Sequence, residues 1–388
     1  MPSEGDERLE GTEVYVESRL TQYLFDKAVR QKVPLNGTFE LSPLCNFRCK
    51  MCYVVQNEAQ IAKAGRSGFT AKQWLKLAEE ARDAGMLMLL LTGGEPFLWP
   101  EFFELYHGLS GMGLQISINS NGSMIDRKTV EELAKRPPTR INITLYGASE
   151  ETYGALCGNP AGYARTVEAI DMLREAGISI NPNCSLTPWN CHDLDRMAAF
   201  AQERKLIFEV NTYMFPPMRR APELVGQNQR FTPEEAAYWH LYRYGLQHDA
   251  EQYQLMLAKV RDGLIPPPGL DETCVDPATG TVRCRAGRAS FWVTWDGFMT
   301  PCGMVSQPQC DLHTHSFQQA WEQTLEATEK LTTSSVCETC PNQSMCHSCM
   351  AIAAAETGKT QGVPQYLCRM MESMKEQAEK LLTLMNKK

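Results

Sequence analysis

Three cysteines near the start of the chain have a spacing that suits an iron–sulfur cluster. Cys45, Cys49 and Cys52 follow the pattern C-x3-C-x2-C. Three thiolates on so short a loop can bind three irons of a cubane cluster, which leaves the fourth iron without a protein ligand. Such an open iron can chelate a small molecule and pass it an electron. A zinc knuckle is the alternative, but it needs a fourth Cys or His close by, and the nearest His in sequence is His107.

A second group of cysteines lies in the last third of the chain. The pattern reads Cys274-x9-Cys284-x12-Gly297-x4-Cys302, then Cys337-x2-Cys340-x5-Cys346-x2-Cys349, and finally Cys368. Paired C-x2-C motifs also suit zinc ribbons, so zinc is the alternative for this region taken alone. Cys310 is left over, and the neighbouring His313 and His315 are more typical of an ordinary loop than of a metal site.

The elements that must position these cysteines alternate between strand and helix from residue 37 onward. Strands are expected at 38–41, 86–91, 115–119, 140–145, 178–185 and 206–213, and helices at 70–84, 100–109, 127–135, 163–176 and 193–204. Thr70 and Gln73 have the spacing of a capping box, and the apolar run at 86–91 is typical of a strand buried on both faces. Six strands mostly followed by helices predict an α/β fold with a parallel sheet or a partial (β/α)6 barrel.

Glycines and polar residues follow these strands. In parallel α/β folds the ligand binds at the carboxyl ends of the strands, so residues at these positions are candidates for binding. Thr92-Gly93-Gly94-Glu95-Pro96 follows the second strand. Its two glycines would let the backbone approach a ligand closely, and Glu95 supplies a carboxylate.

Later strand ends give further candidates. Asn121 follows the third strand and Thr144 lies at the end of the fourth, although turn-forming residues are equally expected there. On the sixth strand, the period of two places Glu209, Asn211 and Tyr213 on one face. If that face borders the cavity, these three side chains are candidate substrate contacts.

The chain divides into five segments by composition. We expect a leader at 1–36, a strand–helix barrel at 37–215, a polar helical bridge at 216–272, a cysteine-rich domain at 273–370 and a C-terminal helix at 371–388. Fifteen cysteines in 388 residues would suggest disulfides in a secreted protein, but their clustering favours metal.

Charge and hydropathy exclude several classes of protein. The net charge of −8 gives no basic surface for nucleic acid. No apolar run approaches the roughly 18–20 residues needed to span a bilayer. The N-terminus is acidic and polar, without the features of a signal peptide, so we expect a cytoplasmic protein with neither a nucleic-acid nor a membrane partner.

Taken together, the first cysteine motif, the strand–helix alternation and the glycine motif resemble the radical S-adenosylmethionine (radical SAM) superfamily. The resemblance implies that S-adenosyl-L-methionine chelates the open iron and is reductively cleaved to a 5′-deoxyadenosyl radical, which abstracts hydrogen from a substrate. Met51 stands where the family often has an aromatic residue, and its thioether can still pack against adenine. The residues that the resemblance places at the cofactor are Met51, Tyr53, Gly93, Gly94, Glu95, Pro96, Asn121 and Thr144.

The second group of cysteines resembles the SPASM extension, which binds two auxiliary [4Fe–4S] clusters in a subset of these enzymes. The final pair here is separated by two residues instead of the family's three. The resemblance implies a first auxiliary cluster on Cys284, Cys302 and Cys349, with Cys274 or Cys310 as the fourth ligand. It implies a second on Cys337, Cys340, Cys346 and Cys368, and therefore three [4Fe–4S] clusters in all.

The resemblance also implies the type of reaction. Enzymes with a SPASM extension commonly oxidise or crosslink a peptide, so a ribosomally made peptide is the expected substrate, and flavodoxin or ferredoxin the expected electron donor. Oxidation of a small polyol or amine is an alternative. From another class, a non-catalytic iron–sulfur electron carrier or scaffold would also use these cysteines.

Overall fold

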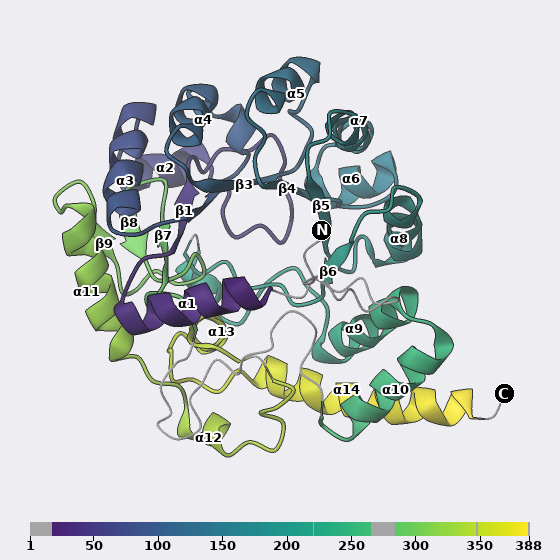
Figure 1. Ribbon diagram of the computed structural model, residues 1–388. Helices are drawn as coiled ribbons and strands as arrows, with labels where there is room; N and C mark the ends of the chain where they lie inside the picture. Colours follow the sequence, from purple (N-terminus) through teal and green to yellow (C-terminus); the bar gives the residue numbers. More distant parts are fainter. Residues whose placement is uncertain (1–17, 220, 265–283, 347, 387–388) are drawn as a thin grey trace, which may run out of the picture.

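A computed structural model describes residues 18–219, 221–264, 284–346 and 348–386. Its centre is a nine-stranded sheet with the order β6-β5-β4-β3-β2-β1-β7-β8-β9 (Figure 1). Strands β1 to β6 are parallel to one another, and β6 and β9 form the two edges of the sheet. These strands confirm the predicted α/β fold with an open parallel sheet.

The six predicted strands lie close to their expected positions. They are β1 (Asn36–Glu40), β2 (Met88–Thr92), β3 (Gln115–Ser120), β4 (Arg140–Thr144), β5 (Ile180–Ser185) and β6 (Glu209–Asn211). The sheet continues beyond β1 into the C-terminal region, through β7 (Ser290–Val293), β8 (Phe298–Thr300) and β9 (Cys310–Asp311). Strand β7 pairs parallel to β1, whereas β8 and β9 are antiparallel. The sequence did not predict that the cysteine-rich region would extend the same sheet.

Helices cover the outer side of the parallel strands (Figure 1). They are α3 (Ala71–Asp83), α4 (Phe102–Ser110), α5 (Arg127–Ala134), α6 (Glu150–Cys157), α7 (Gly162–Glu175) and α8 (Leu194–Glu203). The predicted capping box of α3 is confirmed, because the Thr70 and Gln73 side chains each accept from the other residue's backbone N–H. Helix α6 and the short α2 (Glu58–Ala64), which follows the first cysteine loop, were not predicted.

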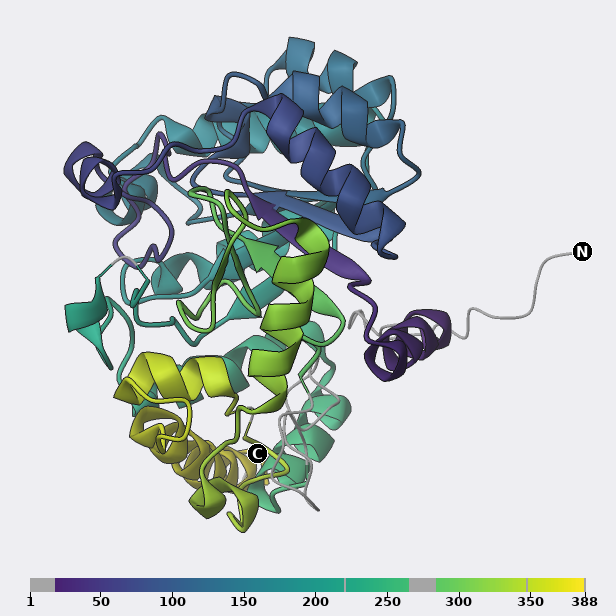
Figure 2. The ribbon, with the colours of Figure 1, turned by 90° about the vertical axis from the view of Figure 1, so that its left-hand side faces the viewer.

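The remaining helices pack around the C-terminal half. They are α1 (Arg19–Gln31), α9 (Pro233–Gln247), α10 (Ala250–Arg261), α11 (Phe317–Glu329), α12 (Ser335–Glu338), α13 (Met350–Thr357) and α14 (Gln365–Met385). Helix α14 packs on α9 and α10, and Figure 2 shows this half beneath the strand–helix half. Because α14 begins at Gln365 and continues past residue 371, it carries Cys368 of the cysteine-rich region and the C-terminal segment on one element.

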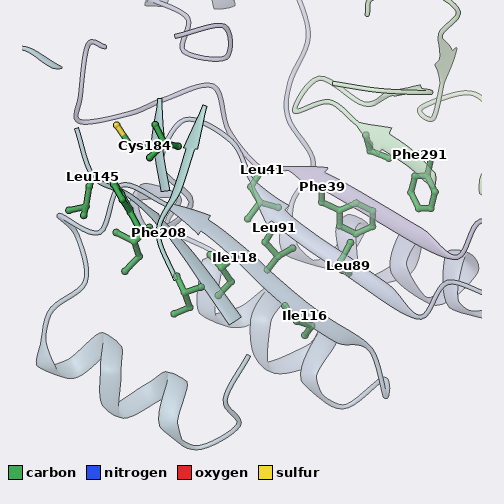
Figure 3. Close-up of a cluster of buried hydrophobic side chains, with 14 of the residues drawn as sticks. Phe39, Leu41, Leu89, Leu91, Ile116, Ile118, Leu145, Cys184, Phe208 and Phe291 are labelled. Carbon is green, nitrogen blue, oxygen red and sulfur yellow. The ribbon is translucent and has the colours of Figure 1, made fainter. Parts of the chain in front are cut away.

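One hydrophobic core connects the two halves. It includes Phe39 and Leu91 on the parallel strands, Phe291 on β7, Trp321 on α11 and Met370 on α14. Figure 3 shows Phe291 beside Phe39, where β7 extends the sheet next to β1. Within the part of the chain that the structure describes, no helix combines the length and the apolar composition needed to cross a bilayer.

Candidate active site and cysteine clusters

A cavity of about 690 Å³ lies at the carboxyl ends of the parallel strands. Each of the six strands contributes lining residues, either at its own end or from the loop that follows it. Examples are Cys45 after β1, Gly94 after β2, Asn121 after β3, Thr144 at the end of β4 and Asn211 at the end of β6. The parallel arrangement therefore brings together segments that are far apart in the sequence, as the strand order requires.

The three cysteines of the first motif all line this cavity and lie close together. Burial raises the pKa of the Cys45 thiol to about 12, and the neighbouring thiols of Cys49 and Cys52 act in the same direction. Backbone N–H groups nevertheless point at the sulfurs: Phe47 donates to Cys45 Sγ at 3.3 Å and Val55 to Cys52 Sγ at 3.3 Å. These donors stabilise thiolates, which are the protonation state that binds iron.

Helix α6 holds the cysteine loop in place through its last turn. The backbone N–H of Arg48 donates to the Cys157 carbonyl at 2.7 Å, and that of Lys50 donates to the Leu156 carbonyl at 3.1 Å. Phe47 is almost fully buried and packs edge-on against Tyr153 of the same helix. The loop is thus anchored on an element that the sequence had not predicted.

The two glycines after β2 pack against the cysteine loop. The Gly94 N–H donates to the Ser42 carbonyl at 2.7 Å, and a Cβ on Gly94 would lie 2.1 Å from the Leu44 carbonyl oxygen. Gly93 has a φ of +147°, and a Cβ there would lie 2.6 Å from the Ser42 carbonyl oxygen. Both glycines also line the cavity, but what requires glycine is the close approach of the two loops.

Glu95 is fully buried and does not line the cavity. Its carboxylate accepts hydrogen bonds from the Asn121 backbone at 2.8 Å, from Ser120 Oγ at 2.9 Å and from the Phe97 backbone at 3.2 Å. Burial raises the pKa of this carboxyl to about 7, even though the three hydrogen bonds lower it. Glu95 therefore holds the loop after β3 in position without itself reaching the cavity. The predicted contact residue Pro96 does not line the cavity either.

Asn121 connects that loop to the cysteines. Its Nδ2 donates to Asn46 Oδ1 at 2.9 Å and lies 3.6 Å from Cys45 Sγ. Asn46 in turn donates to Ser123 Oγ at 2.8 Å. Thr144, the other polar candidate, lines the cavity and donates to Asn183 Oδ1 at 3.0 Å. The contribution of Asn46 was missed, because a single asparagine between two cysteines has no distinctive spacing.

Cysteines from the C-terminal region reach the same cavity. Cys284 and Cys349 line it together with Met51 and Tyr53 of the first motif. The wall on this side is apolar and comes from α13 and α14, with the side chains of Ile352, Leu367, Met370 and Met371. One cavity therefore has the first cysteine group and part of the second on its surface, which the sequence alone did not reveal.

The described C-terminal cysteines include two groups of neighbouring thiols. Burial raises the pKa of the Cys349 thiol to about 12, and the nearby thiols of Cys284 and Cys302 add to the effect. Burial likewise raises the pKa of the Cys346 thiol to about 12, and its neighbouring thiols are Cys368, Cys337 and Cys340. The two sets interleave along the chain, since Cys349 belongs with Cys284 and not with the adjacent Cys346.

Two remaining cysteines bear on the fourth ligand of the first auxiliary set. Cys274 lies outside the described residues. Cys310 is buried on β9, where its thiol donates to Gln323 Oε1 at 3.3 Å. No other cysteine is among the groups that shift the pKa of Cys310. His313, two residues after β9, packs on the ring of Phe69 with centroids 4.7 Å apart, in keeping with an ordinary loop.

The described thiols lie near one another without converging on a single point. Within the described ranges, no three Cys, His, Asp or Glu side chains are arranged to hold one metal ion. Tetrahedral zinc requires four ligand atoms about 2.0–2.3 Å from one ion, whereas the thiolates of a four-iron cluster bind separate irons and stand farther apart.

Two of the three substrate candidates in and after β6 line the cavity, and one does not. Asn211 and Tyr213 line the cavity, whereas Glu209 does not and instead accepts from Asn181 Nδ2 at 3.1 Å. The Tyr213 hydroxyl donates to Glu356, so its proton is not available to a ligand. The three were candidate contacts on the condition that their shared face borders the cavity, and Glu209 does not meet this condition, because its side chain is bonded to Asn181 of β5.

Two lining residues come from the helical bridge and were not predicted. His240 and Arg243 lie on α9 and border the cavity beside Thr212 and Tyr213. His240 Nδ1 lies 3.3 Å from Thr212 Oγ1, and Arg243 donates to the Val210 carbonyl. The bridge thus forms part of the site, although its polar helical sequence gave no sign of this.

The comparisons with known proteins agree with this geometry. The model of the radical SAM superfamily matches residues 39–201. The AdoMet-dependent heme synthase of Methanosarcina barkeri is 23% identical over 342 residues, which cover 82% of this chain and 92% of that protein. The sporulation killing factor maturation protein SkfB of Bacillus subtilis is 27% identical over 299 residues, which cover 76% of this chain and 67% of that protein.

A solved structure shows the same fold over nearly the whole chain. Streptococcus suis SuiB bound to the precursor peptide SuiA matches with a TM-score of 0.63 at 18% identity, covering 92% of this chain and 84% of that one. The match extends over both the parallel sheet and the cysteine-rich region. With the family match and the cavity described above, the chain carries a radical SAM domain at residues 39–201 and is a radical SAM enzyme.

Proposed function

We propose that this enzyme modifies a ribosomally made peptide, by oxidation or crosslinking, with three [4Fe–4S] clusters. Cys45, Cys49 and Cys52 would hold the cluster that binds S-adenosylmethionine. The first auxiliary cluster would lie on Cys274, Cys284, Cys302 and Cys349, and the second on Cys337, Cys340, Cys346 and Cys368. When bound, the first cluster and S-adenosylmethionine would supply a 5′-deoxyadenosyl radical that removes hydrogen from the substrate.

The observation that carries the proposal is the single cavity with cysteines on two sides. The first motif lies on one side, and Cys284 and Cys349 lie on the other. A substrate between them would be close both to the site of hydrogen removal and to a cluster that can accept the remaining electron. The apolar side chains of α13 and α14 would exclude water from this space.

The residues around the first motif have separate tasks in this proposal. Met51 and Asn121 line the cavity, where they would contact the adenosyl and ribose groups. Gly93 and Gly94 would present backbone groups to the methionine part of the cofactor. Glu95 would act through Asn121, because its carboxylate holds the Asn121 backbone and does not reach the cavity.

The relatives support a peptide substrate without identifying one. SkfB is named for the maturation of a killing factor, and SuiB has been solved with a precursor peptide. Flavodoxin or ferredoxin is the electron donor that we propose for this chain. We expect the enzyme to work in the cytoplasm, without a nucleic-acid or membrane partner.

A small-molecule substrate, such as a polyol or an amine, is the second candidate. The heme synthase relative aligns over more of this chain than SkfB does, and its name denotes a small product. The cavity volume of about 690 Å³ also lies within the range typical of small-ligand sites, about 300–1,000 Å³. A non-catalytic electron carrier is not supported, because the chain is a radical SAM enzyme.

Protease treatment separates the two candidates. The reconstituted enzyme would be incubated anaerobically with S-adenosylmethionine, reductant and a whole extract, small molecules included, of the organism that encodes it, and the 5′-deoxyadenosine formed would be measured. We expect the extract to stimulate 5′-deoxyadenosine formation and prior digestion with protease to abolish the stimulation. Stimulation that survives digestion and passes a small-molecule filter would favour the second candidate.

A further inference from the structure

The cavity contains one charge that the cofactor chemistry does not explain. Among the described residues that line it, Arg243 carries the only formal charge. The rest of the lining consists of thiols, apolar and aromatic side chains, amides and hydroxyls, together with His240. A guanidinium is always protonated in proteins, so this positive charge is permanent.

Arg243 is held in place, but part of its hydrogen-bonding capacity is unused. It donates to the Val210 carbonyl, and its Nη2 lies 3.3 Å from His240 Nε2. Its Nε is buried and has no partner among the described residues. Of the five N–H groups of a guanidinium, these contacts use two. The contact with His240 Nε2 requires that nitrogen to accept, so the ring carries its proton on Nδ1, next to Thr212.

Two other arginines with largely buried side chains, Arg219 and Arg230, are each paired with a carboxylate. Arg230 lies 2.6 Å from Glu356, and Arg219 lies 2.6 Å from Glu40. Within the described ranges, Arg243 forms no ion pair. An unpaired charge is costly in a largely apolar space, so the protein would gain stability from an anion at this point.

The cysteine groups do not account for this charge. The cation that acts on the Cys302 thiol is Arg219. The strongest charged influences on the Cys45 thiol are Glu95 and the neighbouring thiols, and Arg243 is not among them. Arg243 instead contacts β6 and its own helix α9, at the part of the cavity that the bridge contributes.

We infer that Arg243 binds a carboxylate of the substrate. This inference rests on the proposed function, because it assigns this part of the cavity to substrate. The unused N–H groups on Nη1 and Nη2 can donate charge-assisted hydrogen bonds to the oxygens of a carboxylate. The apolar part of the same molecule would lie against Met370 and Met371 of α14. In a peptide substrate, the group bound would be the side chain of Asp or Glu or the C-terminal carboxylate.

The test uses two ligands of the same shape that differ in charge. The full-length enzyme with its clusters reconstituted would be titrated anaerobically with 4-phenylbutyrate and with 4-phenylbutyramide, in saturating S-adenosylmethionine, by calorimetry. We expect the carboxylate to bind at least about tenfold more tightly than the amide, as for a charge-assisted hydrogen bond. Equal binding of the two ligands to the wild-type enzyme would overturn the inference without any variant.

Variants then assign the preference to Arg243. Arg243→Met is expected to remove the preference for the carboxylate, and Arg243→Lys to retain part of it. Arg261→Met is the matched control, because Arg261 is a half-exposed arginine on α10 that pairs with Asp262. A preference that persists in Arg243→Met would contradict the inference. If Arg243→Met does not fold with normal iron content, Arg243→Lys and the ligand pair still give the answer.

Competition between phenylbutyrate and S-adenosylmethionine shows whether Arg243 binds a carboxylate of the substrate or that of the cofactor. If Arg243 serves the substrate, the affinity for S-adenosylmethionine stays within about twofold in Arg243→Met, and phenylbutyrate does not compete with the cofactor. Competition between the two would mean that Arg243 binds the carboxylate of S-adenosylmethionine, which overturns the inference.

The inference can fail independently of the proposed function. Stimulation of 5′-deoxyadenosine formation that resists protease would refute the peptide substrate and leave the carboxylate preference intact. Conversely, protease-sensitive stimulation that survives methyl esterification of the extract would keep the peptide and refute the carboxylate anchor.

Discussion

At the scale of single residues, the positions of the cavity-lining residues depend on buried side chains that do not themselves line the cavity. Glu95 is the clearest case, because it orders Asn121 and Ser120 and touches nothing in the cavity. Asn121 then points its amide at Asn46 and Cys45. A change at Glu95 is therefore transmitted to the cysteine loop through the backbone of one asparagine.

We predict that Glu95→Gln loosens this connection. The Asn121 and Phe97 backbone N–H groups donate to different oxygens of Glu95. Glutamine has only one acceptor oxygen, so its NH2 group would face one of these two N–H groups and leave that buried donor without a partner. Such a loss costs about 1–3 kcal/mol in the free energy of unfolding. We also expect weaker binding of S-adenosylmethionine, measured by equilibrium dialysis. Glu104→Gln, at an exposed position on α4, is the control, and equal behaviour of the two variants would refute this account of Glu95.

The sequence predicted some residues well and others for the wrong reason. Spacing identified the cysteine sets, because several thiols at fixed intervals form a distinctive pattern. The glycines after β2 were predicted at the cavity, but they are required by the adjacent loop after β1, which no sequence pattern shows. Arg243 could not be predicted, because one arginine on a polar helix resembles any solvated residue until the helix is placed against β6.

At the scale of elements, one buried aspartate joins three segments of the strand–helix half. Asp193, at the start of α8, accepts from the Ala148 backbone at 2.7 Å and from Thr152 Oγ1 at 2.6 Å. Ala148 follows β4, and Thr152 lies in the first turn of α6. Since α6 in turn anchors the cysteine loop, the position of that loop depends indirectly on Asp193.

We predict that Asp193→Asn destabilises the protein at neutral pH and not in acid. Burial alone would raise the pKa of Asp193, but the bonds from Thr152 and Ala148 and the charge of Arg196 lower it below the usual value of an aspartate. A lowered carboxyl pKa stabilises the fold above the unfolded pKa, and the stabilisation is lost as the pH falls through the folded pKa. Replacing charge-assisted bonds by neutral ones should cost about 1 kcal/mol at pH 7.

Urea denaturation at several pH values would check this prediction. The difference in free energy of unfolding between Asp193→Asn and the wild-type protein should be constant above about pH 5 and shrink below about pH 4. Asp83→Asn, at an exposed position, should show no such dependence. A difference that does not change with pH would mean that the Asp193 charge has no part in stability.

Element prediction succeeded where the pattern was long and regular. The six parallel strands and the capped helix α3 followed from apolar runs and end signals. Strands β7, β8 and β9 have four, three and two residues, too few to show a period by themselves, whereas the three-residue β6 lies within a longer alternating run at 206–213. Pairing of β7 with β1 depends on contacts between residues more than 250 positions apart, for example Asn36 with Ser290.

At the scale of the whole molecule, the cysteine-rich region is part of the same folded body as the radical SAM domain. Phe291 on β7 is buried in the common core, and its ring packs on Phe317 and Trp321 of α11. Gly37 on β1 leaves room for the same ring, since a Cβ there would lie 2.6 Å from Phe291 Cζ. The two cysteine groups can therefore keep a fixed relation across one cavity.

We predict that Phe291→Ala destabilises both halves together. Removing a buried phenylalanine should cost about 3–5 kcal/mol in the free energy of unfolding. The probes of unfolding should still coincide in one transition, because the core is continuous. Leu255→Ala is the control, since Leu255 is 59% exposed on α10. Separate transitions for the N-terminal and C-terminal halves would contradict a shared core.

The most direct test of the account is the iron content of the reconstituted enzyme and of a variant with Cys45, Cys49 and Cys52 all changed to Ala. Three four-iron clusters predict about twelve irons per chain in the wild-type protein and about eight in the variant. The variant should also lose all formation of 5′-deoxyadenosine from S-adenosylmethionine. About four irons in the wild-type protein, with zinc in the C-terminal region, would contradict the three-cluster site and remove the main support for peptide modification.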